Sequence, residues 1–186
     1  MVAWSEQTEK DLPVEQLIQP ESWQIRVVQA DETEALVIEN ALRPAFVNEG
    51  RELLYMRSDG IYKRDMESGA EVHVARVYTN LTLYDDFTAN EEGEYIVMTL
   101  PSFNMVSIQE WLPEVEEFGE FLTISDEKAE YFTPVFNQEG DLYAVVEDRD
   151  GEQTIQVRHF LSRDIIRSVV PGQDIAGEVS LDDWYQ

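Results

Sequence analysis

Two kinds of residue in this sequence could carry out catalysis or bind a metal, and the first is histidine. The chain has two histidines, His73 and His159, and no cysteine, so disulfides, zinc–thiolate sites and thiol catalysis are excluded. The histidines fall in separate segments that alternate like strands, and there is no G-x-S-x-G serine elbow for either to activate. Histidines without neighbouring ligands are more often ordinary strand residues than catalytic groups. The sequence therefore predicts that the protein is not an enzyme.

Carboxylates are the second kind, and the cation that they would suit is Ca²⁺. Residues 148–151, Asp-Arg-Asp-Gly, resemble the start of a calcium-binding loop. A complete loop places a glutamate six residues after the glycine, where this chain has Val157. We interpret residues 148–151 as a β-turn, because aspartate and glycine favour such turns.

The elements that would position these residues are short strands that recur along the chain. Three segments share an apolar residue, a turn containing Glu-Gly and an alternating strand: 45–56 (AFVNEGRELLYM), 87–98 (FTANEEGEYIVM) and 135–146 (VFNQEGDLYAVV). Their turn glycines, at 50, 93 and 140, are 43 and 47 residues apart. Four strands in each unit of about 40 to 50 residues predict an all-β fold of four-stranded antiparallel blades, as in a β-propeller.

The units resemble the WD40-like (PD40) repeats of TolB-like β-propellers, which also occur in the propeller domains of prolyl-oligopeptidase-type peptidases. The matching residues are Pro44-Ala45-Phe46, Gly50 and Gly60-Ile61-Tyr62 in the first unit, and Pro134-Val135-Phe136 and Gly140 in the third. The second unit has Asp85-Asp86-Phe87 in place of the proline motif. The resemblance covers about residues 22–186. It implies a propeller scaffold, because the catalytic serine of those peptidases lies in a separate domain.

The repeats divide the single domain that we expect for residues 1–186 into about four blades. Three units are expected at approximately 35–76, 77–125 and 126–170. Residues 22–34 and 171–186 are expected to share a further blade, so that the two chain termini close the ring. The alternative is a half-ring completed by a second copy, because exposed blade faces favour a symmetric homodimer.

Two pairs of aspartates give a separate hypothesis for a cation site. They occupy equivalent places in their units, on or beside the innermost strand: Asp85, Asp86, Asp182 and Asp183. Four carboxylates that converge near a propeller axis would repel one another, and a bound Ca²⁺ would relieve that repulsion. Strand alternation can instead direct them to solvent. We expect no cofactor, and Ca²⁺ is the one alternative that the sequence suggests.

The chain is strongly acidic, with 39 Asp and Glu against 13 Lys and Arg and a net charge of -26. Such a surface disfavours nucleic acid and anionic lipid and attracts basic proteins and divalent cations. Glutamate is spread through every segment. This distribution favours a generally acidic surface, as in adaptation to salt, over a single acidic binding patch.

The sequence also bears on the compartment. No apolar run reaches the roughly 18 residues of a membrane-spanning helix, and we expect no membrane insertion. No signal peptide is visible. We therefore expect a cytoplasmic protein if Met1 is native, and a periplasmic or secreted one if a leader was removed.

The connection 110–121, EWLPEVEEFGEF, is long and acidic and carries aromatic residues. Aromatic anchors with a charged rim are typical of protein interfaces. The predicted partner-binding residues are Trp111, Glu114, Glu116, Glu117 and Phe118. Alternatively, the aromatic residues of this connection cover the core of their own blade.

The favoured function is a non-enzymatic protein-interaction scaffold that binds a basic or mixed-charge protein partner. One alternative is a sensor domain that binds a cation or a small ligand through carboxylates near the propeller axis. The other is an accessory propeller fragment of a peptidase.

Overall fold

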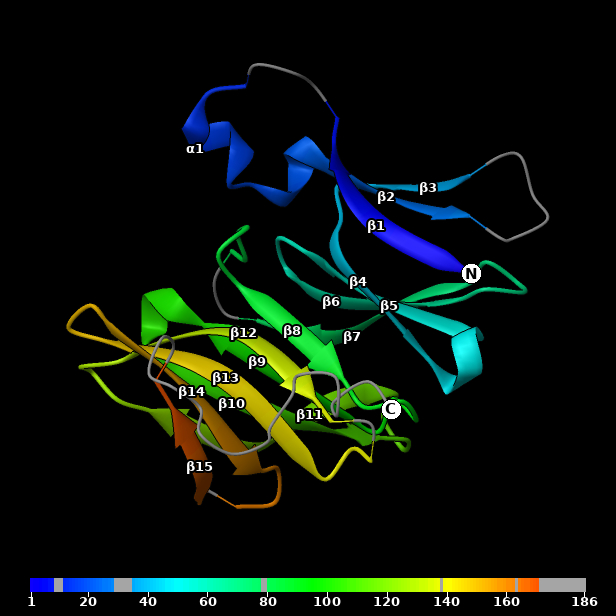
Figure 1. Ribbon diagram of the computed structural model, residues 1–186. Coiled ribbons are helices and arrows are strands. Elements are labelled where there is room, and N and C mark those ends of the chain that lie inside the picture. The colour runs from blue at the N-terminus through cyan, green and yellow to red at the C-terminus, as the bar shows by residue number, and fades with distance from the viewer. Residues whose placement is uncertain (9–11, 29–34, 78–79, 138, 163, 171–186) are drawn as a thin grey trace. The chain divides into compact units, whose positions relative to one another are not determined.

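The computed structural model describes residues 1–8, 12–28, 35–77, 80–137, 139–162 and 164–170 (Figure 1). The chain divides into two compact units. The first comprises Met1–Tyr84 with Leu112–Phe118, and the second comprises Asp85–Trp111 with the described residues from Gly119 onward.

The first unit contains two antiparallel sheets. The first sheet has the order β1-β2-β3, with strands β1 (Val2–Gln7), β2 (Trp23–Val28) and β3 (Leu36–Glu39). The second has the order β4-β5-β6-β7, with strands β4 (Leu42–Val47), β5 (Glu52–Arg57), β6 (Gly60–Asp65) and β7 (Glu71–Arg76). Short helical turns occur between strands: α1 (Val14–Leu17), η1 (Pro20–Ser22) and η2 (Asn48–Gly50).

The second unit is built on two four-stranded antiparallel sheets. One has the order β11-β10-β9-β8, with strands β8 (Asp86–Ala89), β9 (Tyr95–Leu100), β10 (Met105–Leu112) and β11 (Glu117–Ser125). The other has the order β12-β13-β14-β15, with strands β12 (Glu130–Phe136), β13 (Leu142–Arg149), β14 (Glu152–His159) and β15 (Ile165–Val169). A 3-10 turn, η3 (Pro101–Phe103), connects β9 to β10. None of the described helices is long and apolar enough to cross a membrane.

The all-β prediction is confirmed, and the sheets follow from the sequence pattern that predicted them. The expected turn glycines, Gly50, Gly93 and Gly140, have φ of 81°, 68° and 72°, in the left-handed region where other residues are strained. Gly60 is restricted further, because a Cβ there would lie 2.0 Å from the carbonyl oxygen of Ala75 on the neighbouring strand. Gly60 therefore allows β6 and β7 to approach closely at the irregularity in their pairing.

Each unit has an apolar core formed by both of its sheets. In the first unit the buried core residues are Ile25, Val27, Ile38, Ala41, Leu53 and Tyr55. In the second they are Val97, Val106, Ile108, Ala129, Tyr131, Phe136, Tyr143 and Val145. Burial of such side chains stabilises each by about 2 kcal/mol relative to exposure, so each pair of sheets is held face to face mainly by these residues.

The first sheet includes a strand, β1, that lies before the expected blades, which begin at residue 22. Strand β1 pairs with β2 from Val2↔Val28 to Gln7↔Trp23. The sequence of β1 does not show the alternation of buried apolar and exposed polar residues that is typical of a strand. Val2 and Trp4 are exposed, while the small Ala3 packs on the core.

Strand β3 also belongs to this sheet, through its pairing with β2, rather than to the unit expected at 35–76. The closing segment 171–186 lies outside the described residues. Closure by both termini and the single domain over 1–186 therefore stay predictions.

Candidate functional site

The predicted aspartate site is only partly within the described structure. Asp85 is buried just before β8, and Asp86 begins that strand, where its Oδ1 accepts the Phe87 N–H at 2.9 Å. Asp182 and Asp183 lie outside the described residues. Within the described part of the chain, no group of three or more His, Asp and Glu side chains is arranged to hold a metal ion. Convergence of the four carboxylates on Ca²⁺ stays a prediction.

The predicted partner-binding segment forms the tip of the β10–β11 hairpin. Glu114 and Glu116 are exposed at this tip, and Glu117, which begins β11, lies 4.0 Å from Arg76. Phe118 is buried and Trp111 is half-buried. The burial of Phe118 favours the alternative in which it covers a core, so two carboxylates rather than the aromatics are available at the tip.

Two apolar residues that the sequence reasoning missed are exposed at the same tip. Leu112 is 38% exposed and Val115 is 60% exposed. A tight turn fixes them, because the Val115 N–H donates to the Leu112 carbonyl oxygen at 3.2 Å. The signal in the sequence was the alternation of apolar and acidic residues in LPEVEE, which the larger aromatic residues on either side obscured.

A polar cluster, which we name the Arg57 cluster, lies on strands β5, β6 and β7 of the second sheet. Its residues are Tyr55, Arg57, Tyr62, Arg64 and Glu71, which strand pairing places on one face. Arg57 donates from Nη1 to Glu71 Oε1 at 2.6 Å and from Nη2 to Oε2 at 3.3 Å. The Tyr55 hydroxyl donates to the same carboxylate. Burial of the Tyr55 hydroxyl raises its pKa well above its usual range, and the neighbouring Glu71 carboxylate raises the pKa further.

Aromatic stacking holds the Arg57 guanidinium in place. Its carbon lies 4.6 Å from the centre of the Tyr62 ring and 5.4 Å from that of Tyr55, within the range of a cation–π contact. The Tyr62 ring in turn stacks on His73 at 4.6 Å. His73, expected to be an ordinary strand residue, lies in β7 with its Nε2 3.1 Å from the Ala75 carbonyl oxygen.

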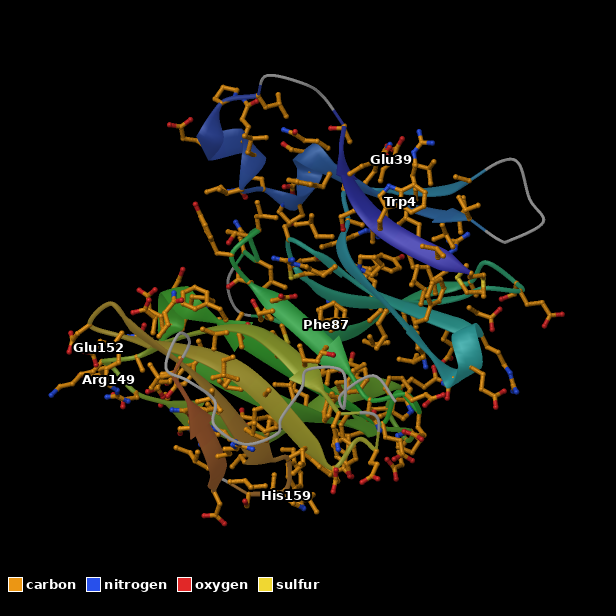
Figure 2. The ribbon with its side chains drawn as sticks, in the orientation of Figure 1. Trp4, Glu39, Phe87, Arg149, Glu152 and His159 are labelled. Atoms are coloured by element: carbon orange, nitrogen blue, oxygen red, sulfur yellow. The ribbon has the colours of Figure 1, made fainter. Side chains whose placement is uncertain are left out.

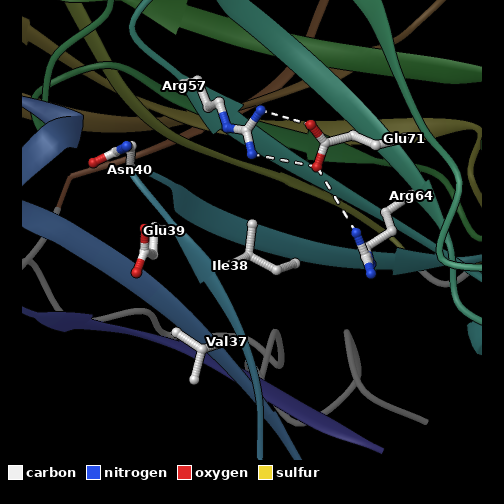
Figure 3. Close-up of a pocket in the computed structure, with 7 residues that line it drawn as sticks. All are labelled: Val37, Ile38, Glu39, Asn40, Arg57, Arg64 and Glu71. Atoms are coloured by element: carbon white, nitrogen blue, oxygen red, sulfur yellow. Dashed lines mark hydrogen bonds and ion pairs between the residues drawn. The ribbon is translucent and has the colours of Figure 1, made fainter.

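Arg64 is the least satisfied member of the cluster. Its one ion pair with a described residue is with Glu71, at 4.0 Å. Its Nε and that of Arg57 are buried without a hydrogen-bond partner among the described residues. Both guanidiniums line a pocket of about 530 Å³ together with Glu71 and four residues from β3 and its end, Val37, Ile38, Glu39 and Asn40 (Figure 3).

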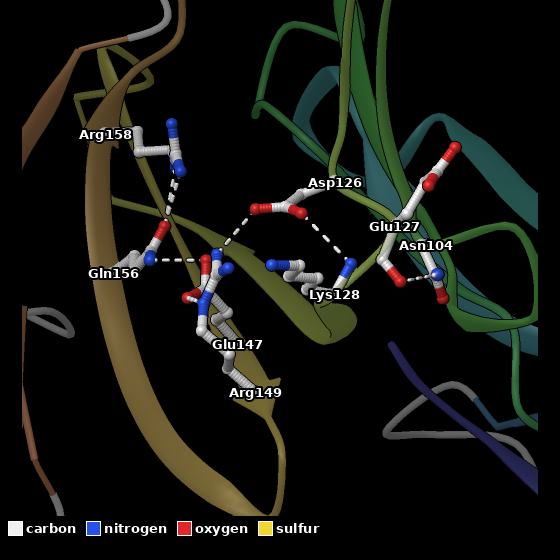
Figure 4. Close-up of polar contacts among 8 residues, drawn as sticks. All are labelled: Asn104, Asp126, Glu127, Lys128, Glu147, Arg149, Gln156 and Arg158. Atoms are coloured by element: carbon white, nitrogen blue, oxygen red, sulfur yellow. Dashed lines mark hydrogen bonds and ion pairs between the residues drawn. The ribbon is translucent and has the colours of Figure 1, made fainter.

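A second polar cluster, the Glu147 network, lies in the second unit, and its members Glu147, Gln156 and Arg158 are buried (Figure 4). Glu147 on β13 is buried, and its carboxylate accepts from Gln156 Nε2 at 2.6 Å and from Arg149 Nε at 3.2 Å. Arg149 also donates to Asp126 Oδ2 at 2.7 Å. Arg158, itself buried, donates from Nε to Gln156 Oε1 at 3.0 Å.

The turn predicted at residues 148–151 joins β13 to β14. Asp148 Oδ1 accepts the Gly151 N–H at 3.0 Å, as expected of an aspartate that stabilises a turn. Arg149 and Glu152 face each other across the end of this hairpin, and His159 lies at the far end of β14 (Figure 2). The pairing supports the turn interpretation over a calcium loop.

The Arg57 cluster could have been found in the sequence. Basic residues are rare in this chain, yet three of them, Arg57, Lys63 and Arg64, fall within eight residues around one hairpin turn. With the turn placed at Ser58-Asp59, alternation puts Tyr55, Arg57, Tyr62 and Arg64 on one face. Glu71 could not be added in that way, because the irregularity between β6 and β7 shifts the register.

Comparison with known proteins identifies the fold. No protein-family model matches the sequence, and neither does any curated protein. Among solved structures, the chain is similar to TolB from Acinetobacter baumannii, with a TM-score of 0.55, 15% identity and coverage of 80% of this chain and 39% of that one. It is also similar to the Cps50 (Swd1) β-propeller domain of Myceliophteria thermophila, with a TM-score of 0.61, 10% identity and coverage of 81% and 53%.

A third similar structure is the hydrazine synthase of Kuenenia stuttgartiensis, with a TM-score of 0.56, 10% identity and coverage of 82% of this chain and 47% of that one. The chain thus spans about half the length of the solved chains that it matches. At these identities the likeness shows the fold alone. The four antiparallel sheets are β-propeller-like blades of the TolB-like and WD40-like kind, as the repeats predicted.

Proposed function

We propose that this protein is a non-enzymatic scaffold that binds a basic or mixed-charge protein partner through the tip of the β10–β11 hairpin. One observation carries the proposal. Leu112 and Val115 are exposed at this tip beside the exposed carboxylates of Glu114 and Glu116. An apolar contact surrounded by charge is the usual composition of a protein interface.

Charge and scaffold both favour this role. The net charge of -26 would steer a basic partner toward the protein and repel nucleic acid. The tip lies on a β-hairpin, and binding residues are commonly placed on connections held by a rigid scaffold. The apolar residues would contribute most of the affinity for the partner. The carboxylates would increase the association rate and make it depend on salt concentration.

The test is affinity capture with the wild-type protein, followed by titration of the purified partner against variants of the tip. We expect Val115→Ser to weaken binding about fivefold or more, and Glu114→Gln with Glu116→Gln to slow association and reduce its salt dependence.

Matched control variants carry the same changes elsewhere. Val135→Ser alters an exposed valine on β12, and Glu127→Gln with Glu152→Gln removes two exposed carboxylates. A partner that binds the tip variants and the control variants equally, or one that is acidic, would show that the proposed surface is wrong.

The half-ring alternative adds a second copy of this chain as a partner. The chain covers 39% to 53% of the similar chains, and a second copy would double the number of blades. A mass measurement in solution distinguishes the two forms. A monomer at all accessible concentrations would exclude the homodimer.

A further inference from the structure

We propose that the pocket beside the Arg57 cluster binds a monocarboxylate with a short apolar body. The ligand's carboxylate would pair with Arg64 and Arg57, and its apolar part would extend along the edge of β3 at Val37. The pocket of about 530 Å³ is within the range of small-molecule sites. Figure 3 shows the two guanidiniums and the β3 residues lining this one pocket. This site is separate from the hairpin tip.

The two arginines that border the pocket have N–H donors without partners among the described residues. A guanidinium has five N–H donors, but Arg64 has only its 4.0 Å ion pair with Glu71 among the described residues. Its side chain is 23% exposed, so water reaches it only in part. Glu71 is already shared, because its two oxygens accept hydrogen bonds from the Tyr55 hydroxyl and from Arg57. An added carboxylate would supply the missing acceptors.

The donors of both arginines are also held in place before any ligand arrives. Arg57 is fixed by its two hydrogen bonds to Glu71 and by the Tyr62 ring. Arg64 is confined by the β6–β7 turn, where a Cβ on Gly69 would lie 3.0 Å from its Nη2. Immobilised donors lower the entropy cost of binding, and the planar guanidinium matches a carboxylate in shape.

The charge of the protein and the residues that line the pocket determine which chemical class of ligand the pocket favours. Glu39 and Glu71 also line the pocket, and the whole chain carries -26, so a dianion such as phosphate meets more repulsion than a single carboxylate. Val37 is 40% exposed and lies on β3, the edge strand of its sheet, which borders the pocket. An anion with an apolar body uses both features.

The experiment is calorimetric titration of the full chain with hexanoate, inorganic phosphate and 1-hexanol at constant ionic strength. We expect saturable binding of hexanoate, weaker binding of phosphate and none of 1-hexanol. Arg64→Gln should weaken hexanoate binding about tenfold or more, because hydrogen bonds to charged groups are lost. Arg51→Gln is the matched control, since this arginine is 77% exposed and pairs with Glu49.

A second pair of variants keeps the test informative if Arg64→Gln does not fold. Val37→Glu places a negative charge at the pocket and should also weaken hexanoate binding about tenfold. Val72→Glu makes the same change at another valine, 42% exposed, and should leave binding unchanged. Absence of saturable hexanoate binding, equal binding by both valine variants, or tighter binding of phosphate than of hexanoate would each overturn the proposal.

Discussion

The Arg57 cluster and the Glu147 network occupy matching places in their units but are completed differently. Arg57 and Arg149 each end the second strand of a sheet, directly before its hairpin turn. Arg57 takes its carboxylate, Glu71, from the fourth strand and borders a pocket. Arg149 takes Glu147 from its own strand and Asp126 from the connection before β12.

The difference shows how one blade position can serve structure or binding. In the Glu147 network the buried carboxylate meets two donors from neighbouring side chains, and buried polar groups satisfied in this way mainly rigidify a fold. In the Arg57 cluster two guanidiniums share one carboxylate, and the Nε donors of Arg57 and Arg64 have no hydrogen-bond partner among the residues that the structure describes. The Glu147 network therefore has a structural role, and the Arg57 cluster is the candidate binding site.

The largest expected effect on the free energy of unfolding comes from a comparison of Gly60 and Gly151, the hairpin glycines beside these two clusters. A Cβ at Gly60 would lie 2.0 Å from the Ala75 carbonyl oxygen, whereas one at Gly151 would meet nothing within 4 Å. We expect Gly60→Ala to lower the free energy of unfolding by about 4 kcal/mol, from overlap and strain together. Gly151→Ala should lower it by about 1 kcal/mol, from its positive φ alone. Urea unfolding measures both, and equal losses would contradict the close approach at Gly60.

The next effect concerns the two central carboxylates. Glu147→Gln should lower the free energy of unfolding by about 2 kcal/mol, because the buried amide would place its own donors against those of Gln156 and Arg149. Glu71→Gln should lower it by only about 1 kcal/mol, since Arg57 and Arg64 remain about a quarter exposed. Unfolding curves under one set of conditions decide the order, and a larger loss for Glu71 would reverse the comparison.

The smallest effect concerns two buried tyrosines. The Tyr55 hydroxyl donates to Glu71, whereas that of Tyr143 has no hydrogen-bond partner among the described residues. At pH 7, Tyr55→Phe should lower the free energy of unfolding by about 1 kcal/mol, and Tyr143→Phe should change it by less than about 0.5 kcal/mol. A larger loss for Tyr143→Phe would show that its hydroxyl is paired.

The same tyrosines predict an alkaline dependence. Burial raises the pKa of Tyr143 to about 12, and that of Tyr55 further, from the usual 10.0. Because the folded pKa is the higher one, this stabilisation is complete below pH 10 and is lost as the pH rises above 10 toward the folded pKa. The free energy of unfolding should fall between pH 10 and 12, and each Phe variant should fall less steeply. Parallel wild-type and variant curves would contradict the raised pKa values.

Hairpins were predictable because their information is local. Alternation and the Glu-Gly turns identified β5, β9 and β13 and the strands that follow them, since a turn fixes which residues pair across it. Strand β1 was missed because its inward side chains are small or polar and its exposed ones are apolar. The assignment of β3 to its sheet depends on pairing with β2 across a connection that has no turn signature in the sequence.

For the sites, the sequence identified the hairpin at 110–121 but not which of its residues are exposed. Phe118 was expected to contact a partner and is buried, while Val115 was overlooked and is 60% exposed. Sequence pattern indicates that a side chain is apolar, but burial depends on what packs over it, and that information is not local.

The sequence by itself determined an acidic, cysteine-free, all-β chain of propeller-like repeats, because composition and short-range alternation suffice for those properties. Only the tertiary structure decided that Glu71 meets Arg57 and that β3 lies across a pocket from Arg64. The first contact crosses the register irregularity between β6 and β7, and the second brings together strands of two different sheets. Their geometry depends on how the sheets pack, and short-range periodicity cannot encode it.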